Sequence, residues 1–251
     1  MSTGSPASPD TAAAAAAAGR TRDLLHAPLL PTLLRLATPN VMGLFATTVV
    51  IGYDGYILGR LGADALAGVA LVFPLSMLML QMSNGGMGGA VASSVARALG
   101  AGRSDEARRL VPQALLIATV LALLFTALLL GLGRPLFSAM GGSGAALEAA
   151  LAYSNVLFAG ALAIWVPTIL SAVVRGTGNM VLPSLLLSGT AIIHLGLCPL
   201  LVFGWGPLQG LGVAGAAIST PSTSLLSGGV LGGDLLRGEG APPRGGPARG
   251  F

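Results

Sequence analysis

The segment LATPNVMGLFATTVVIGYDGYILGRLG, residues Leu36–Gly62, indicates the class of fold most directly. It carries no charged side chain from Leu36 to Tyr53, and the first charge that it reaches is the carboxylate of Asp54. A helix of roughly 20 apolar residues crosses a bilayer core of about 30 Å, so the stretch predicts a membrane span near residues 36–58. An ionisable side chain at membrane depth is costly and indicates function. Asp54 is therefore the first candidate functional residue.

The composition extends this prediction to the whole chain. Of its 251 residues, 53% are hydrophobic and only 9% are charged, and the mean hydropathy is +0.82. Further apolar runs follow the first, and none shows the long polar and apolar alternation that a membrane β-barrel requires. We therefore predict an all-α integral membrane protein, a six-helix transmembrane bundle in contact with the lipid bilayer. The predicted spans lie near residues 36–58, 65–94, 110–133, 149–174, 179–203 and 211–236.

The positive charges predict the orientation of the chain. With six spans and a cytoplasmic amino terminus, eleven of the 13 arginines fall on the inner side, and Arg60 and Arg134 fall on the outer side. Cytoplasmic loops carry an excess of positive charge, so we expect a multi-pass protein of the plasma (inner) membrane with both termini cytoplasmic. A nucleic-acid interface would gather its cations on one domain, so no nucleic-acid partner is expected. The inner set comprises Arg20, Arg22, Arg35, Arg97, Arg103, Arg108, Arg109, Arg175, Arg237, Arg244 and Arg249.

The two ends of the chain have the composition of tails. Residues 1–30 contain a run of alanines, Ala12–Ala18, and their arginines follow that run, which is the wrong order for a cleaved secretory signal. Residues 237–251 read RGEGAPPRGGPARGF, a disordered basic segment by composition. We therefore predict a cytoplasmic tail at 1–30, a transmembrane lobe at 31–236 and a second cytoplasmic tail at 237–251.

The reactive side chains are too few to build a catalytic site. The chain has two histidines, one cysteine and nine acidic residues, and they form no Ser-His-Asp set, zinc-binding spacing or phosphate loop. The glycines of Gly210–Gly215 match a dinucleotide-binding pattern, but no strand or acidic partner accompanies them. Cys198, as the single cysteine, excludes an intrachain disulfide. We expect no enzyme activity, no cofactor and no resident metal.

An ordered series of short motifs resembles one transporter family. The segment YDGYILGRLG at residues 53–62 is followed by DALAG at 64–68, RALGAG at 97–102, RGTGN at 175–179 and GVAGAAIST at 212–220. Together they resemble the multidrug and toxic compound extrusion (MATE) family, from about Leu30 to Thr220. The ordered set is far more specific than any single motif.

The resemblance implies a fold of two similar six-helix lobes around a cavity that faces inside and outside alternately. This chain is long enough for one lobe, and its motifs match the amino-terminal one. After Thr220 the pattern weakens, with Pro221, paired glycines and Asp234 inside the expected sixth helix. We expect the amino-terminal half of a transporter, from a truncated, frameshifted or split gene. The alternative is a complete six-helix protein that dimerises.

The resemblance also implies a function and a site. In the family, organic cations or amphiphilic drugs leave in exchange for protons or sodium, and the acid matching Asp54 couples the two. Tyr153 falls at a cavity tyrosine of the proton-coupled branch, whereas His194 and Cys198 stand where that branch has Asn and Asp. Imidazole and thiol suit sodium poorly and imidazole titrates near neutral pH, so proton coupling is favoured over sodium. Our hypothesis is that Asp54 and His194 are the titrating pair and that Tyr153 hydrogen-bonds to one of them.

Other interpretations stay open at this point. Asp54 could instead pair with Arg60 at the membrane interface, and His194 could be a neutral side chain bonded to a helix carbonyl. A lipid-linked saccharide flippase of the same superfamily would need intramembrane cations for a pyrophosphate group, and the predicted spans offer none. A non-transporting membrane fragment or assembly partner is the third interpretation.

Overall fold

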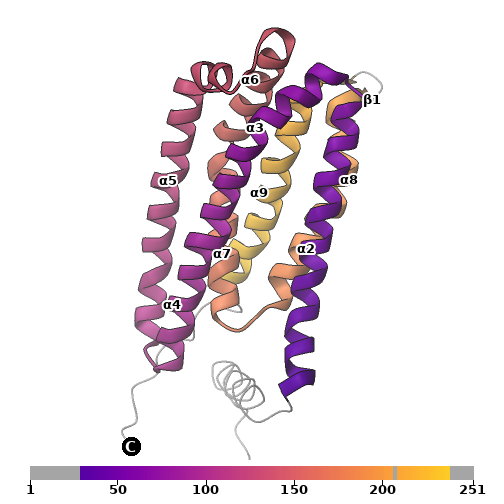
Figure 1. Cartoon of the computed structure of the whole chain (residues 1–251). Helices are drawn as coiled ribbons and strands as arrows, with labels where there is room; N and C mark the ends of the chain where they lie inside the picture. The colour runs from indigo at the N-terminus through magenta and orange to yellow at the C-terminus, as the bar shows by residue number, and fades with distance from the viewer. Residues whose placement is uncertain (1–28, 206–207, 238–251) are drawn as a thin grey trace, which may run out of the picture.

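The computed structural model describes residues 29–205 and 208–237 (Figure 1). Both predicted tails therefore lie almost wholly outside the described residues, although helix α2 already begins at Leu29 and helix α9 runs to Arg237. The helices are α2 (Leu29–Gly59), α3 (Ala63–Gln81), the π-helix η1 (Met82–Gly88), α4 (Gly89–Gly100), α5 (Ser104–Ala139), α6 (Gly144–Ala159), α7 (Ala161–Gly176), α8 (Val181–Phe203) and α9 (Val213–Arg237).

Several of these helices are long and apolar enough to cross a membrane. Within the described residues, four segments meet that criterion, and the bent pair α6 and α7 makes a possible fifth. Helix α9 is not among them because serine, threonine and glycine interrupt its apolar residues. The prediction of an all-helical membrane bundle is confirmed, whereas a sixth span near 211–236 stays a prediction. The four segments are Val41–Gly59, Ala63–Gly100, Ser104–Ala139 and Val181–Phe203.

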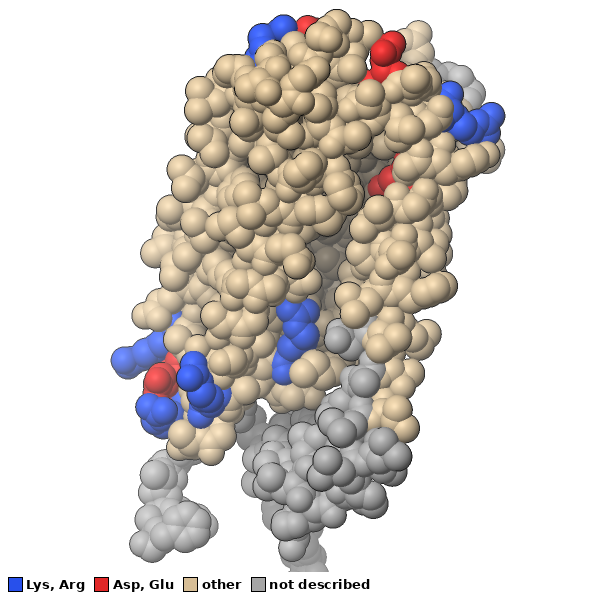
Figure 2. All heavy atoms as spheres, viewed as in Figure 1, with Lys and Arg blue, Asp and Glu red and all other residues tan. Residues whose placement is uncertain are grey.

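The outer surface of the bundle is apolar. On α5, Leu116 is 66% exposed and Leu124 is 58% exposed, as expected for side chains that face lipid. The buried core lies between α3, α5, α6 and α7, around Phe137, Phe158 and Trp165. Figure 2 shows most of the charged side chains near the two ends of the molecule, with a broad uncharged surface between them.

One predicted span contains a π-helix. The glycine-rich segment MSNGGMG of η1 continues α3 into α4 without a break in the chain. Its wider turns interrupt the regular α-helical register, and such insertions are frequent at functional sites. Within η1, Asn84 lies on the wall of an internal cavity.

The fourth predicted span is bent by 47° between α6 and α7. Gly160 lies at the bend, where an added Cβ would come within 2.8 Å of Pro221 on α9. A second contact between a proline and a glycine lies further along these helices, with the two residues exchanged. Here a Cβ on Gly228 of α9 would come within 2.7 Å of Pro167 on α7. Each proline ring thus packs against a glycine of the neighbouring segment, and the missing Cβ allows α7 and α9 to approach closely.

A two-stranded hairpin connects α8 to α9 and was not predicted. Strand β1 (Gly204–Trp205) pairs antiparallel with β2 (Leu208–Gln209), in the segment where the sequence analysis expected only a break between spans. Gly204 has a φ of +78°, which favours glycine at this sharp exit from α8. The hairpin is the one departure from helix among the described elements.

Candidate functional site

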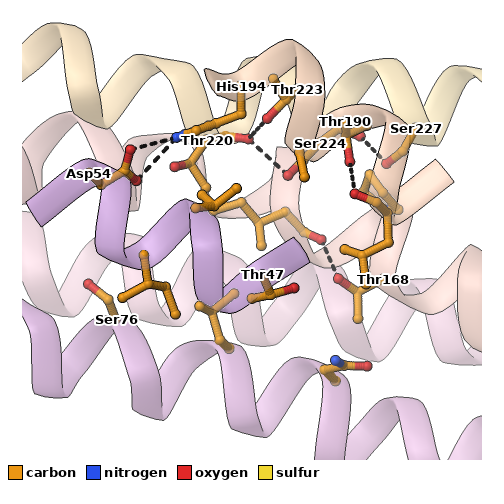
Figure 3. A pocket seen from close by; sticks show the side chains of 18 of the residues that line it. Thr47, Asp54, Ser76, Thr168, Thr190, His194, Thr220, Thr223, Ser224 and Ser227 are labelled. Carbon is orange, nitrogen blue, oxygen red and sulfur yellow. Dashed lines mark hydrogen bonds and ion pairs between the residues drawn. The ribbon is translucent and has the colours of Figure 1, made fainter. Parts of the chain in front are cut away.

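A cavity of about 730 Å³ lies inside the bundle. Its walls come from α2, α3, η1, α6, α7, α8 and α9, and Figure 2 shows the surface hollowed along the side on which α2 lies. Most of the wall is apolar, with hydroxyl groups spaced along it. These are Thr47, Ser76, Thr168, Thr190, Thr220, Thr223, Ser224 and Ser227, labelled in Figure 3.

The hydroxyl protons are largely used within the helices. Thr47 donates to the Gly43 carbonyl at 3.0 Å, and Thr168 donates to the Ile164 carbonyl at 2.7 Å. A hydroxyl that donates to its own helix still offers its oxygen as an acceptor. The cavity therefore presents hydrogen-bond acceptors on an apolar wall, a surface suited to amphiphilic organic molecules.

The carboxylate of Asp54 meets the imidazole of His194 on this wall. His194 Nε2 lies 2.9 Å from Asp54 Oδ1 and 3.1 Å from Oδ2, although 140 positions separate the residues in sequence (Figure 3). The packing of α2 against α8 brings them together. The His194 side chain is only 4% exposed and that of Asp54 is 21% exposed, so Asp54 is the more accessible partner from the cavity.

Cys198 lies one helical turn beyond His194 on α8. It is fully buried, and its sulfur neighbours the Asp54 carboxylate and the Ser219 hydroxyl. Because one ligand atom from each of Asp54, His194 and Cys198 lies within 4.8 Å of the others, these three side chains could hold a metal ion. Cys198 itself does not line the cavity.

Tyr153 also lies near this group but does not make the predicted hydrogen bond among the described residues. It lines the cavity from α6, close enough for the charge of Asp54 to act on its hydroxyl. Among the described residues, its hydroxyl makes no hydrogen bond to Asp54 or His194. Tyr153 therefore lines the same cavity as Asp54 and His194, without the hydrogen bond that was predicted.

Neither the Arg60 guanidinium nor a helix carbonyl takes the place of the contact between Asp54 and His194. The guanidinium of Arg60 stands over the Phe203 ring, with Cζ 5.6 Å from the ring centroid, and makes no ion pair with Asp54. His194 Nε2 faces the Asp54 carboxylate and not a helix carbonyl. A direct acid and imidazole pair is what the structure shows.

Arg175 is a cavity residue that the sequence analysis missed. It ends α7, lines the cavity, and donates from Nη1 to Ser171 Oγ at 2.8 Å and from Nη2 to Asn84 Oδ1 at 3.3 Å. Within residues 29–205 and 208–237, no carboxylate lies at ion-pair distance from it. Arg175 lies one residue beyond the predicted span 149–174, so the cavity wall carries a cation that the predicted spans do not contain. Helical spacing was an available signal, because Thr168, Ser171 and Arg175 recur at intervals of three and four on one face.

The fold and the cavity together define a class of protein. Membrane-length helices surround a cavity with a carboxylate, an imidazole and a guanidinium on its wall, which is the arrangement of a membrane transporter lobe. The MatE family model matches residues 39–200. The chain belongs to the MATE family, a family of secondary transporters and not of enzymes, and the resemblance noted in its motifs is confirmed.

Two curated relatives share this region. The FAD transporter of Shewanella oneidensis is 31% identical over 200 residues, which cover 78% of this chain and 43% of the relative. The probable multidrug resistance protein NorM of Deinococcus radiodurans is 33% identical over 198 residues, with the same coverage of 78% and 43%. The chain thus spans less than half the length of these relatives.

Solved structures give the same match. The chain superposes on a MATE transporter crystallised in the straight conformation with a TM-score of 0.77 and 27% identity, covering 86% of this chain and 47% of that one. A MOP superfamily transporter from Pyrococcus furiosus gives a TM-score of 0.79 and 26% identity, covering 90% and 50%. The prediction of a bundle equivalent to one transporter lobe is confirmed.

Proposed function

We propose that this chain is the amino-terminal lobe of a cation-coupled exporter that moves organic cations or amphiphilic drugs across the membrane by alternating access. The observation that carries the proposal is the pair formed by Asp54 and His194 on the wall of a cavity of about 730 Å³. The cavity is large enough for a drug-sized molecule. Relatives named as multidrug resistance proteins support this substrate class.

The pair offers a simple mechanism for coupling. Burial disfavours an unpaired carboxylate, and a nearby cation favours the charged form. With His194 neutral, the pair is a net anion that attracts an organic cation. When the pair takes up a proton, that attraction is lost and the cargo is released. Proton and cargo therefore occupy one site in alternation, with Asp54 as the coupling residue.

The side chains around Asp54 favour a proton over sodium as the coupling ion. Sodium binds best among several oxygen ligands, as do other hard cations. Here the nearest side chains from α8 supply a ring nitrogen and a sulfur, from His194 and Cys198. Imidazole takes up a proton near neutral pH. Proton exchange is thus the reaction that this set of groups suits.

We propose that a second lobe completes the transport pathway. The chain spans about half of the structures that it matches. Large apolar side chains are exposed on α2, among them Phe45 at 70%, and a protein surface or lipid must cover them. The second lobe is either a separate carboxy-terminal half or another copy of this chain. A non-transporting fragment is the remaining interpretation.

Anionic cargo is a second candidate, and Arg175 is the observation that favours it. A guanidinium on a cavity wall that has no carboxylate partner among the described residues can bind a phosphate or carboxylate through two parallel hydrogen bonds. The relative from Shewanella oneidensis is named as an FAD transporter, and the cargo in that name carries a pyrophosphate. A lipid-linked saccharide flippase would use the same group. A substitution of Arg175 therefore tells the anionic candidate from the cationic one.

We propose an orientation with both termini cytoplasmic, and cysteine labelling tests it. The exposed residues Ala101 and Ser143 lie just beyond opposite ends of α5, whose 36 residues span about 54 Å. In a Cys198→Ser background, we expect Ser143→Cys to react with a membrane-impermeant maleimide on intact cells. Ala101→Cys is expected to react only after the cells are permeabilised.

The two labelling sites control for each other. The reverse pattern would show the inverted orientation and would overturn the positive-inside argument. Labelling of both sites from the same side would contradict the crossing of the membrane by α5. If neither site reacts in permeabilised cells, the labelling is repeated on denatured protein, in which both cysteines are accessible.

Transport in everted membrane vesicles tests the proposed function. We would prepare vesicles with this chain alone, with a tandem fusion of two copies, and with the carboxy-terminal half of a full-length relative. A pH gradient is formed by respiration, and ethidium is then added in the absence of sodium. We expect ethidium uptake and partial collapse of the pH gradient in at least one preparation that contains two lobes.

Each outcome separates the interpretations. Ethidium uptake driven only by an imposed sodium gradient would contradict proton coupling. Uptake of an anionic flavin nucleotide without uptake of ethidium would favour the second candidate. No uptake in any preparation, with the chain inserted in the membrane, would identify a non-transporting fragment.

A further inference from the structure

Asp54, His194 and Cys198 bring three different metal-binding groups together. Their ligand atoms, a carboxylate oxygen, an imidazole nitrogen and a sulfur, all lie within 4.8 Å of one another. His194 and Cys198 are four positions apart on α8, so they lie on one face of that helix. Asp54 approaches from the facing helix α2. The bundle thus holds the three groups in place from two packed helices.

We propose that these three residues form a binding site for a late first-row divalent transition metal ion, with Zn²⁺ as the best fit. Zn²⁺ takes cysteine sulfur, histidine nitrogen and carboxylate oxygen as ligands. Sodium, magnesium and calcium prefer oxygen alone. A mixed set of oxygen, nitrogen and sulfur therefore selects for the transition metals.

The charges of the site fit a divalent ion. Binding releases the thiol proton of Cys198, so the thiolate and the Asp54 carboxylate supply two negative charges to balance the metal. The imidazole of His194 binds as the neutral form. The metal and its three ligands then carry no net charge. Cys198 and His194 are both buried, and an uncompensated charge would be costly there.

The distances require only small side-chain movements. Tetrahedral zinc bonds of about 2.0–2.3 Å place ligand atoms about 3.3–3.8 Å apart. His194 Nε2 and Asp54 Oδ1 are now 2.9 Å apart and would separate by a few tenths of an ångström. The widest separation, at most 4.8 Å, would shorten by about 1 Å on side-chain rotation.

The surroundings provide support for the sulfur and an open coordination position. Ser219 on α9 is fully buried beside Cys198, and its hydroxyl donates to the Ala216 carbonyl at 2.7 Å. Because that proton is already used, Ser219 restricts the position of the sulfur by packing against it and not by donating a hydrogen bond to it. Asp54 and His194 both line the cavity, so the fourth metal position faces a space that water or a ligand can reach.

Cobalt binding to the purified chain tests the proposal. Co²⁺ replaces Zn²⁺ in such sites and gives visible absorption, with an added charge-transfer band when a thiolate is a ligand. Cys198 is the only cysteine of the chain, so that band reports on this site alone. We expect a one-to-one complex with the thiolate band, which Zn²⁺ then abolishes. The protein must carry an affinity tag without histidine.

The following variants distinguish a site with three protein ligands from adventitious metal binding to the Cys198 thiol alone. Cys198→Ser is expected to remove the thiolate band, and Asp54→Asn and His194→Gln are each expected to weaken Co²⁺ binding by at least about tenfold. His26→Ala, which removes the only other histidine, is the matched control and should bind as the wild type does. A thiolate band that persists unchanged in both Asp54→Asn and His194→Gln would overturn the proposal.

The absence of a stoichiometric complex in the folded wild-type chain would also overturn it. Where His194→Gln fails to give a monodisperse protein, Asp54→Asn and Cys198→Ser decide the question. The measurement needs a single lobe and no transport. A protein that binds no metal could still export drugs, and one that binds Zn²⁺ could be silent in vesicles, so this inference and the proposed function fail separately.

Discussion

Asp54→Asn is expected to abolish proton-coupled export. Asparagine keeps the size and a hydrogen-bonding oxygen near His194 Nε2, which now lies 2.9 Å from the carboxylate, but it can neither take up a proton nor attract a cation by charge. A hydrogen bond to a charged group contributes about 1.5–3 kcal/mol, and the variant also loses the group that takes up the proton, so transport should fall by at least about tenfold. The measurement is substrate-induced collapse of the pH gradient in the vesicle preparation that is active with the wild type.

Asp64→Asn is the matched control for this prediction. Asp64 is another acid near the same end of the bundle, but it is exposed in the first turn of α3 and does not line the cavity. The control should transport as the wild type does. Full coupling in Asp54→Asn, or an equal loss in both variants, would remove Asp54 from the mechanism.

Arg175→Gln is expected to remove the affinity for anionic cargo and to leave cationic cargo unaffected. Glutamine can still hydrogen-bond to Ser171 and Asn84, the two present partners of Arg175, but it carries no charge. Hydrogen bonds to charged groups contribute about 1.5–3 kcal/mol, so binding should weaken by about 10–100-fold. Quenching of flavin fluorescence on titration of FAD with the purified chain in lipid nanodiscs measures this.

Arg97→Gln and ethidium binding are the controls for the second prediction. Arg97 lies in the last turn of α4, contacts Ser94 at 3.3 Å and is absent from the cavity wall. Arg97→Gln should bind FAD as the wild type does. If Arg175→Gln weakens ethidium and FAD binding equally, then Arg175 serves only to tie α7 to η1. If the wild type binds no FAD, the anionic candidate is wrong.

The sequence was sufficient for the fold because hydropathy and charge act over whole segments. Apolar runs of membrane length appear without any knowledge of tertiary contacts, and the ordered motifs pointed to the correct family. Asp54 could be found for the same reason, as a lone charge in an apolar run. That His194 lies beside it could only be proposed from the resemblance, because 140 residues separate the two and only packing of α2 on α8 joins them.

The features that the sequence did not predict depend on contacts between helices. Gly160, at the bend between α6 and α7, lies against Pro221 of the distant helix α9, which leaves no room for a side chain there. The π-helix of η1 lies within an apolar run that reads as one continuous span. Arg175 was counted among the inner-side arginines, directly after the predicted span 149–174, whereas in the structure it lies in the last turn of α7 and lines the cavity. Local patterns do not contain this information.

The sparse contact between α2 and α3 determines how a molecule reaches the cavity. α2 packs on α8 and makes few contacts with α3, so the hollow visible in Figure 2 opens on the side of the bundle. In a lone lobe, acyl chains reach the same wall as a drug. The drug concentration that governs occupancy is then the concentration dissolved in the membrane. Two compounds with equal intrinsic affinity would rank by their lipid–water partition coefficients.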